Sequence, residues 1–192
     1  MKKLILLLFA TIGLAGCEIE YGKTVNYAPT KVEVARTEST DEFSEYTKTT
    51  VERIVDGDTI IVKQPFTKEA TIRLILINTK ESVGEFKDNP EPFGVEASDF
   101  TKMLVENKEV WLEYDIDDTD PYGRTLAYVW LKDVVYSYDG FEYNEPAITL
   151  NELLLRHGLA HVAVYEPNVK YKEHFYSVEN VAKKLKIGIW SN

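Results

Sequence analysis

The sequence has one cysteine among its 192 residues, and its basic side chains are outnumbered by its acidic ones. With Cys17 alone, no disulfide can form within the chain. Lysine and arginine number 22 against 32 aspartates and glutamates, which gives a net charge of −10. This balance argues against a protein that binds nucleic acid through a broad basic surface. It leaves room for a compact site where a few cations and a metal ion meet one phosphate.

Long apolar runs are equally scarce, and the N-terminus carries the only long one. Two lysines precede the apolar residues 4–15, which are too few to span a bilayer comfortably, and the run ends on Leu14-Ala15-Gly16-Cys17. This ending resembles a bacterial lipobox, which implies cleavage before Cys17 and lipidation of its thiol. An ordinary signal peptide with an incidental cysteine is the alternative. We therefore predict that residues 1–16 are a lipoprotein signal peptide and that the protein is lipid-anchored on the extracytoplasmic side of the cell membrane.

Few large apolar residues follow the cysteine. Residues 18–47 are rich in Glu, Thr, Ser and Lys and show no sustained period of two or of 3.6. We interpret residues 17–47 as the lipidated cysteine and a flexible tether, with an added strand or helix as the alternative. Residues 48–192 are then long enough to form one domain around a single core.

Within this domain, alternating and helical patterns predict an α+β fold. Two β-branched runs, 50–55 and 59–63, flank Asp56-Gly57-Asp58, which is a strong hairpin signal. Further strands are predicted at residues 70–77, 110–116 and 125–131. Helices are predicted at residues 94–107, from the capping box at Thr149 to Gly158, and along an apolar stripe from Tyr171 to Leu185. Five strands with interleaved and terminal helices favour a small barrel.

Three short segments contain residue types that act on phosphate. The first is Asp56-Gly57-Asp58-Thr59, which on its own is ordinary turn chemistry. The second is Arg73 in an apolar strand, which needs a carboxylate, a phosphate or a ligand unless it lies on a solvated face. The third, Asn78-Thr79-Lys80-Glu81, places an amide oxygen, a main-chain carbonyl and a carboxylate in one loop. Together they indicate an oxygen site for a hard cation beside an arginine, which is what phosphodiester hydrolysis requires.

The same segments, in the same order, resemble the motifs of the staphylococcal nuclease (thermonuclease) family. The resemblance is carried by Asp56-Gly57-Asp58-Thr59 and by residues 73–81, 93–98, 120–128, 151–152, 158–160 and 189–191. It covers about residues 48–192, which is the whole predicted domain. It implies a five-stranded OB-fold β-barrel with three helices and a calcium-dependent hydrolysis of DNA and RNA.

The resemblance also implies a role for each site residue. Glu81 would be the general base for the attacking water, while Arg73 and Arg124 would grip the phosphate and stabilise the transition state. The implied calcium ligands are Asp58, Asn78 and the backbone carbonyl of Thr79, with Asp56 acting through a water molecule. The positions that line the nucleotide pocket in the family correspond to Tyr122 and Tyr165.

Four features depart from the family pattern. Asn78 stands where the family has an aspartate, so the predicted calcium site has one negative charge fewer. Lys80 replaces a proline, which we expect to loosen the loop before the catalytic glutamate. Pro121 replaces a lysine after an acidic turn at residues 115–120. Residues 133–147 form a longer hairpin with an aromatic tip, which we interpret as self-packed, with a partner-binding surface as the alternative.

We therefore predict a monomeric, calcium-dependent nuclease that acts on DNA and/or RNA at the outer face of the membrane. One alternative is a catalytically weak or inactive module of the same fold that binds nucleic acid or an envelope partner. Another is an envelope lipoprotein that uses the barrel for protein or glycan contacts. The acidic surface and the missing aspartate favour a non-catalytic module, whereas Arg73, Glu81 and Arg124 disfavour it. His157 and His161 are separated by a helix-ending glycine, so they are not expected to bind a metal.

Overall fold

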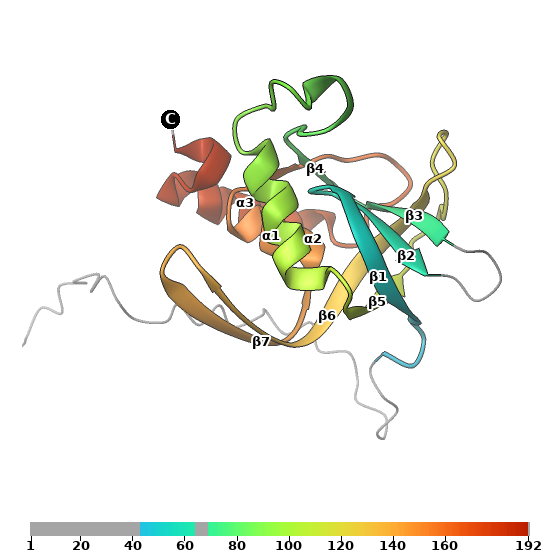
Figure 1. The fold of residues 1–192 in the computed structure, drawn as a ribbon. Helices are drawn as coiled ribbons and strands as arrows, with labels where there is room; N and C mark the ends of the chain where they lie inside the picture. Colours follow the sequence, from blue (N-terminus) through green and yellow to red (C-terminus); the bar gives the residue numbers. More distant parts are fainter. Residues whose placement is uncertain (1–42, 64–68, 192) are drawn as a thin grey trace, which may run out of the picture. The chain divides into compact units, whose positions relative to one another are not determined.

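The pairing of the first strands builds one wall of a barrel. The computed structural model describes residues 43–63 and 69–191 (Figure 1). β1 (Thr47–Asp56) pairs antiparallel with β2 (Thr59–Lys63), and β2 pairs antiparallel with β3 (Glu69–Leu74). The tight β1–β2 connection through Gly57 and Asp58 is the hairpin that the sequence predicted.

Two further strands close the barrel. β5 (Glu109–Glu113) pairs antiparallel with β1 and with β6 (Thr125–Tyr138). Parallel pairing of β6 with β3 then completes a ring of five strands. The described residues also form three α-helices, so the predicted α+β fold, a five-stranded OB-fold-like barrel with three helices, is confirmed.

The core is filled from both the strands and the second helix. Ile60, Ile61 and Val62 are consecutive and all buried in β2, and Tyr128 of β6 is fully buried. Such continuous apolar runs arise because the strands are covered on both faces. α2 (Leu150–Arg156) adds four buried leucines to this core. Each large apolar side chain removed from water in this way contributes about 1.5–3 kcal/mol.

The helices begin and end at the residues that the sequence marked, within a few positions. α1 spans Gly94–Val105, and α3 spans Lys172–Leu185. Thr149 is confirmed as the N-cap, because its hydroxyl accepts a hydrogen bond from the Glu152 amide at 3.1 Å, while the Glu152 carboxylate pairs with Arg156 and His174. Gly158 has a φ of +62° directly after α2, a left-handed conformation that favours glycine.

The third predicted strand is broken into two, and this break shapes the site. Leu76 adopts a left-handed conformation with a φ of 63°, after which β4 (Ile77–Thr79) pairs with β8 (Ala160–Val162). The buried Asn151 side chain donates a hydrogen bond to the Ile75 carbonyl at 2.8 Å and so satisfies a group that the bend frees from the ladder. The prediction of a single strand over residues 70–77 was wrong. No local glycine or proline marks the bend, which is stabilised by the distant Asn151 side chain.

The long hairpin packs on its own domain. β6 continues as far as Tyr138 and pairs with β7 (Phe141–Thr149), which places the hairpin beside α1 (Figure 1). The Tyr136 and Tyr143 rings stack with centroids 4.7 Å apart, and the Tyr138 ring lies 4.8 Å from that of Phe100 in α1. The aromatic residues at 136, 138 and 143 therefore serve the self-packed hairpin that the sequence favoured.

His157 is a core residue beneath this hairpin. Its Nε2 lies 2.9 Å from the Tyr136 hydroxyl, and burial followed by the charge of Arg156 lowers the pKa of His157 to about 4. The imidazole is therefore neutral at physiological pH. That His157 and His161 do not bind a metal stays a prediction.

The N-terminal boundary of the packed region lies earlier than predicted. Phe43 is buried, with its ring 5.6 Å from that of Trp111 and 5.7 Å from that of Trp130. β1 then begins at Thr47. Residues 43–47, predicted as the end of the tether, thus pack on the barrel. Cys17, the predicted signal peptide and the rest of the tether lie outside the described residues. Within the described part of the chain, no helix is long and apolar enough to cross a membrane.

Candidate active site

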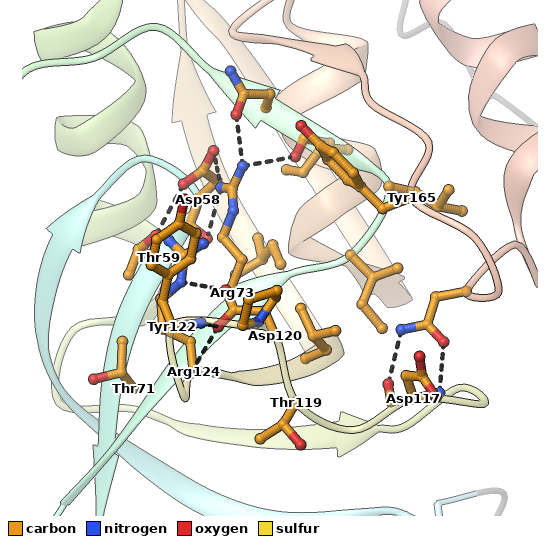
Figure 2. Close-up of a pocket in the computed structure, with 18 of the residues that line it drawn as sticks. Asp58, Thr59, Thr71, Arg73, Asp117, Thr119, Asp120, Tyr122, Arg124 and Tyr165 are labelled. Carbon is orange, nitrogen blue, oxygen red and sulfur yellow. Dashed lines mark hydrogen bonds and ion pairs between the residues drawn. The ribbon is translucent and has the colours of Figure 1, made fainter.

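One open pocket collects the predicted site residues. It has a volume of about 1080 Å³ and lies where the β1–β2 turn, β3 and β4 meet the loops at residues 117–124 and 165–168. The pocket is lined by Asp56, Asp58, Arg73, Asn78, Glu81, Tyr122, Arg124 and Tyr165. Thr79, the remaining predicted ligand, is buried next to Asp58 and Asn78. Residues from separate parts of the chain are therefore brought together as the sequence predicted (Figure 2).

Arg73 lies near the middle of this pocket, beside the β1–β2 turn. It is an ion-pair partner of the Asp58 carboxylate, and its side chain is only 11% exposed. Its guanidinium also donates to the Asn78 side-chain oxygen at 2.6 Å and to the Ile77 carbonyl at 3.2 Å. Burial, followed by the charge of Arg124, lowers the pKa of Arg73 to about 10, so the group stays charged at neutral pH. The alternative of an arginine on a solvated strand face is excluded.

The oxygens predicted to bind calcium lie on three neighbouring groups. The Thr79 amide donates to the Asp58 carboxylate at 2.9 Å, and the Asn78 amide nitrogen donates to the Thr79 carbonyl at 3.1 Å. Carboxylate, amide and main-chain carbonyl oxygens are the donor set that calcium prefers, so these residues fit the ion. Within residues 43–63 and 69–191, no three His, Cys, Asp or Glu side chains gather as a metal cluster.

Asn78 is the ligand whose geometry fits least directly. Its side-chain oxygen accepts the Arg73 hydrogen bond, and its nitrogen points to the Thr79 carbonyl. A cation that used both the Asn78 and the Thr79 oxygens would need the amide to rotate and Arg73 to release it. An aspartate would present an oxygen in either orientation of its side chain. With asparagine in place of the family's aspartate, the site therefore loses this second oxygen as well as one negative charge.

Glu81 and Asp56 form a neighbouring pair of carboxyl groups. Burial, followed by hydrogen bonding and charge repulsion from Asp56, raises the pKa of Glu81 above its ordinary value, while Arg73 opposes the rise. Asp56 is itself buried, and its Oδ1 accepts hydrogen bonds from the Gly57 amide and from the hydroxyls of Ser82 and Ser98. Glu81 is thus held near an anion that favours proton uptake, as suits a group that removes a proton from water.

Arg124 is organised by the acidic turn that precedes it. One Asp120 oxygen accepts from the Arg124 Nε at 2.6 Å, and the other accepts from the amides of Tyr122 and Arg124 at 2.9 Å. Although burial opposes the effect, these hydrogen bonds from Arg124 and Tyr122 lower the pKa of Asp120. The Asp120 charge therefore shapes the loop and orients Arg124, in addition to contributing to the acidic surface.

Two exposed tyrosines flank the arginines. Tyr122 is 85% exposed, and its ring centroid lies 5.5 Å from the Arg124 guanidinium carbon. Tyr165 is 73% exposed and comes from the loop after β8, on the other side of Arg73 in the view of Figure 2. Exposed aromatic rings beside cationic groups can stack with nucleic-acid bases while the arginines meet a phosphate.

A second acidic residue of the turn links the two loops that carry these tyrosines. The Asp117 amide donates to the Asn168 side-chain oxygen, and the Asn168 side-chain nitrogen donates to the Asp117 carbonyl, both at 2.8 Å. Asn168 is 3% exposed. Sequence reasoning did not identify Asn168, because its only signal is its position near Tyr165.

The comparisons with known proteins agree with this geometry. The family described as staphylococcal nuclease homologue matches residues 71–192. The chain is 44% identical over 142 residues to the thermonuclease of Staphylococcus hyicus, covering 73% of each chain, and 39% identical over 142 residues to that of Staphylococcus intermedius, covering 73% of this chain and 74% of the relative. It is 41% identical over 146 residues to endonuclease YncB of Bacillus subtilis, covering 74% of this chain and 61% of that protein. The chain belongs to the staphylococcal nuclease family.

Proposed function

We propose that this protein is a calcium-dependent nuclease that hydrolyses phosphodiester bonds of DNA and/or RNA. The observation that carries the proposal is the convergence of Arg73, Glu81 and Arg124 on one pocket beside a set of hard oxygen ligands. A module that only binds nucleic acid has no use for a carboxylate with a raised pKa beside Arg73. The names of its relatives, thermonuclease and endonuclease, support the same class of reaction.

Each residue of the pocket then has a distinct task. Glu81 accepts a proton from the attacking water, and the two arginines donate hydrogen bonds to the phosphate oxygens as negative charge builds on them. Asp58, Asn78 and the Thr79 carbonyl would hold calcium, with Asp56 contacting it through water. The bound ion would neutralise part of the phosphate charge. Tyr122 and Tyr165 would stack with the bases on either side.

The raised pKa of Glu81 predicts how activity responds to acid. A base must be deprotonated to act, so the rate should fall as the pH drops through the pKa of Glu81. Because that pKa lies above the ordinary glutamate value, the acid limb of kcat/KM should also lie above it. An acid limb at or below the ordinary glutamate pKa would contradict the assigned role.

Metal dependence is the first test of the proposal. The protein without residues 1–17 should be incubated with labelled single-stranded DNA and, separately, with RNA, in calcium, in magnesium and in chelator. We expect cleavage in calcium and none in chelator, with activity restored when calcium is added in excess. Cleavage that persists in chelator would contradict the calcium requirement. No cleavage at millimolar calcium would contradict the nuclease assignment itself.

One structural observation favours a non-catalytic alternative. Asp58 and Asn78 both hold Arg73, so two of the proposed calcium ligands are already engaged. If that arrangement persisted with nucleic acid present, the pocket would bind a phosphate without cutting it. Fluorescence anisotropy with a labelled oligonucleotide distinguishes the two functions. Binding without cleavage at millimolar calcium would favour the module, whereas turnover of the bound oligonucleotide supports the enzyme.

We also propose that the enzyme acts at the outer face of the membrane, anchored through lipid on Cys17. The support for this proposal is the Leu14-Ala15-Gly16-Cys17 ending of the N-terminal apolar run. An exported nuclease would meet extracellular nucleic acid and plentiful calcium.

A further inference from the structure

One residue, Glu91, holds the backbone of the loop that carries Glu81 through two hydrogen bonds. Glu91 lies ten residues beyond Glu81, at the far end of a polar loop that contains a short 3-10 helix, η1 (Gly84–Phe86). One oxygen of the Glu91 carboxylate accepts the Glu81 amide at 3.0 Å, and the Glu91 amide donates to the Glu81 carbonyl at 2.9 Å. Both peptide groups of Glu81 are therefore fixed by the same residue.

Lys80 strengthens this connection instead of loosening the loop as the sequence led us to expect. Its Nζ donates to the other Glu91 oxygen at 3.1 Å. The Glu91 carboxylate thus bridges the Lys80 side chain and the Glu81 backbone, and these contacts lower the pKa of Glu91, the Glu81 amide being the first cause. An ion pair and two backbone hydrogen bonds here supply stiffness that a proline would otherwise give to the residue before Glu81.

The residue after Glu81 is held from the opposite side. The hydroxyls of Ser82 and Ser98 each donate to Asp56 Oδ1 at 2.8 Å, and the two hydroxyls lie 2.9 Å apart. Ser98 belongs to α1, and the start of this helix approaches the loop so closely that a Cβ on Gly94 would lie 2.5 Å from the Glu81 carbonyl oxygen. Glu81 therefore lies between two anchored neighbours.

We propose that Glu91 and Ser98 are positioning residues that hold Glu81 in its catalytic orientation. Glu91 fixes the backbone of Glu81, and Ser98 fixes the next residue through Asp56 and Ser82. The hydrogen bonds of Glu91 go to Lys80 and Glu81, so Glu91 acts through Glu81, whereas Ser98 reaches Glu81 through Ser82 and Asp56, the residue proposed to contact calcium through water. This inference rests on the proposed role of Glu81 as the general base.

The expected effect is on the chemical step. A displacement of about 1 Å at a catalytic group can cost about 10²-fold in rate, so Glu91→Ala should lower kcat by about tenfold or more. The KM for single-stranded DNA and the calcium midpoint should each stay within about twofold of the parental values, because no binding contact is lost. Ser98→Ala should lower kcat by a smaller factor, since Ser82 still reaches Asp56.

The variant Glu91→Gln distinguishes the effect of the hydrogen bond to Glu81 from the effect of the ion pair with Lys80. Glu91→Gln keeps an oxygen that can accept from the Glu81 amide, but it loses the ion pair with Lys80, so it should recover most of the kcat lost in Glu91→Ala. Lys80→Ala removes only the ion pair and should behave like Glu91→Gln. Asp88→Ala is the matched control, because Asp88 is an exposed carboxylate in the same loop. Circular dichroism checks the fold of each variant.

The decisive experiment is a double-mutant cycle in the full-length protein, measured as single-turnover cleavage at saturating calcium. If Glu91 acts through Glu81, adding Glu91→Ala to Glu81→Gln should slow the reaction by less than about twofold, because the group being positioned is already gone. A further loss of tenfold in the double variant would overturn the proposal, as would a parental kcat in Glu91→Ala. The proposed function fails separately, when Glu81→Gln alone cleaves at the parental rate.

Discussion

Asn78→Asp tests how the pocket holds calcium. The change adds one negative charge at a position whose oxygen now accepts a hydrogen bond from Arg73 at 2.6 Å. It also gives the side chain an oxygen in both orientations, so that one can face a cation while the other keeps Arg73. Two effects then oppose each other, because the new carboxylate attracts calcium but also strengthens its pairing with the arginine.

The balance can be worked from the charges. Two unit charges at 4 Å interact by about 1 kcal/mol in bulk water, and by more in a partly buried pocket. A divalent ion therefore gains about 2 kcal/mol from the new carboxylate, while the competing charge of Arg73 offsets about 1 kcal/mol on the same scale. A net gain of about 1 kcal/mol lowers the calcium midpoint by about fivefold, and a gain of about 1.4 kcal/mol lowers it by about tenfold.

The assay is a calcium titration of the cleavage rate, with calorimetric titration of calcium alone. Asn144→Asp serves as the control, because it adds the same charge at an exposed position on the β6–β7 hairpin. We expect the midpoint to fall only for Asn78→Asp. An unchanged midpoint in both measurements would show that residue 78 does not bind calcium, and an equal shift in the control would attribute the change to net charge.

Arg73→Lys should lower turnover by about two orders of magnitude or more, because an ammonium cannot replace the guanidinium fork. Arg53→Lys on the surface should have no effect. Turnover by Arg73→Lys at the parental rate would refute the role of Arg73. Cys17→Ser should release the protein from the membrane fraction or leave it unprocessed, as a blot of fractionated cells would show; full membrane retention at the parental processed size would contradict lipidation. The hydrogen bond to Glu152 raises the pKa of His174 in the folded protein. The protonated His174 therefore stabilises the fold fully below the pKa of an unfolded histidine, near 6.5, and this contribution is lost as pH rises through the folded pKa. Urea unfolding should show this loss of stability in the parent and not in His174→Gln.

The sequence predicted much of this structure because local signals agreed with the fold. Asp56-Gly57-Asp58 marks a hairpin, Thr149 caps a helix, and Gly158 ends it, and all three behave as their chemistry dictates. Arg73 could be singled out because a guanidinium in an apolar strand demands a partner. Its partner, Asp58, comes from the hairpin turn that the sequence also marked.

The features that sequence reasoning missed depend on contacts between distant residues. The left-handed Leu76 has no glycine or proline to mark it and is stabilised by Asn151, 76 residues away from the Ile75 carbonyl that it satisfies. The Glu91 contacts replace a missing proline with an ion pair between residues eleven positions apart and a hydrogen bond between residues ten apart. Phe43 lies in a polar segment, yet it is buried beside two tryptophans of β5 and β6. The pattern of residues along the sequence does not show such contacts between distant residues.

We propose that Glu81 is the general base for phosphodiester hydrolysis in this pocket. The most direct test is the single-turnover cleavage rate of a labelled single-stranded oligonucleotide by the parental protein, by Glu81→Gln and by Glu85→Gln, an exposed glutamate in the same loop. We predict that Glu81→Gln binds the oligonucleotide as tightly as the parent and cleaves it about two to four orders of magnitude more slowly, while Glu85→Gln matches the parent. A folded Glu81→Gln protein that cleaves at the parental rate would contradict this account.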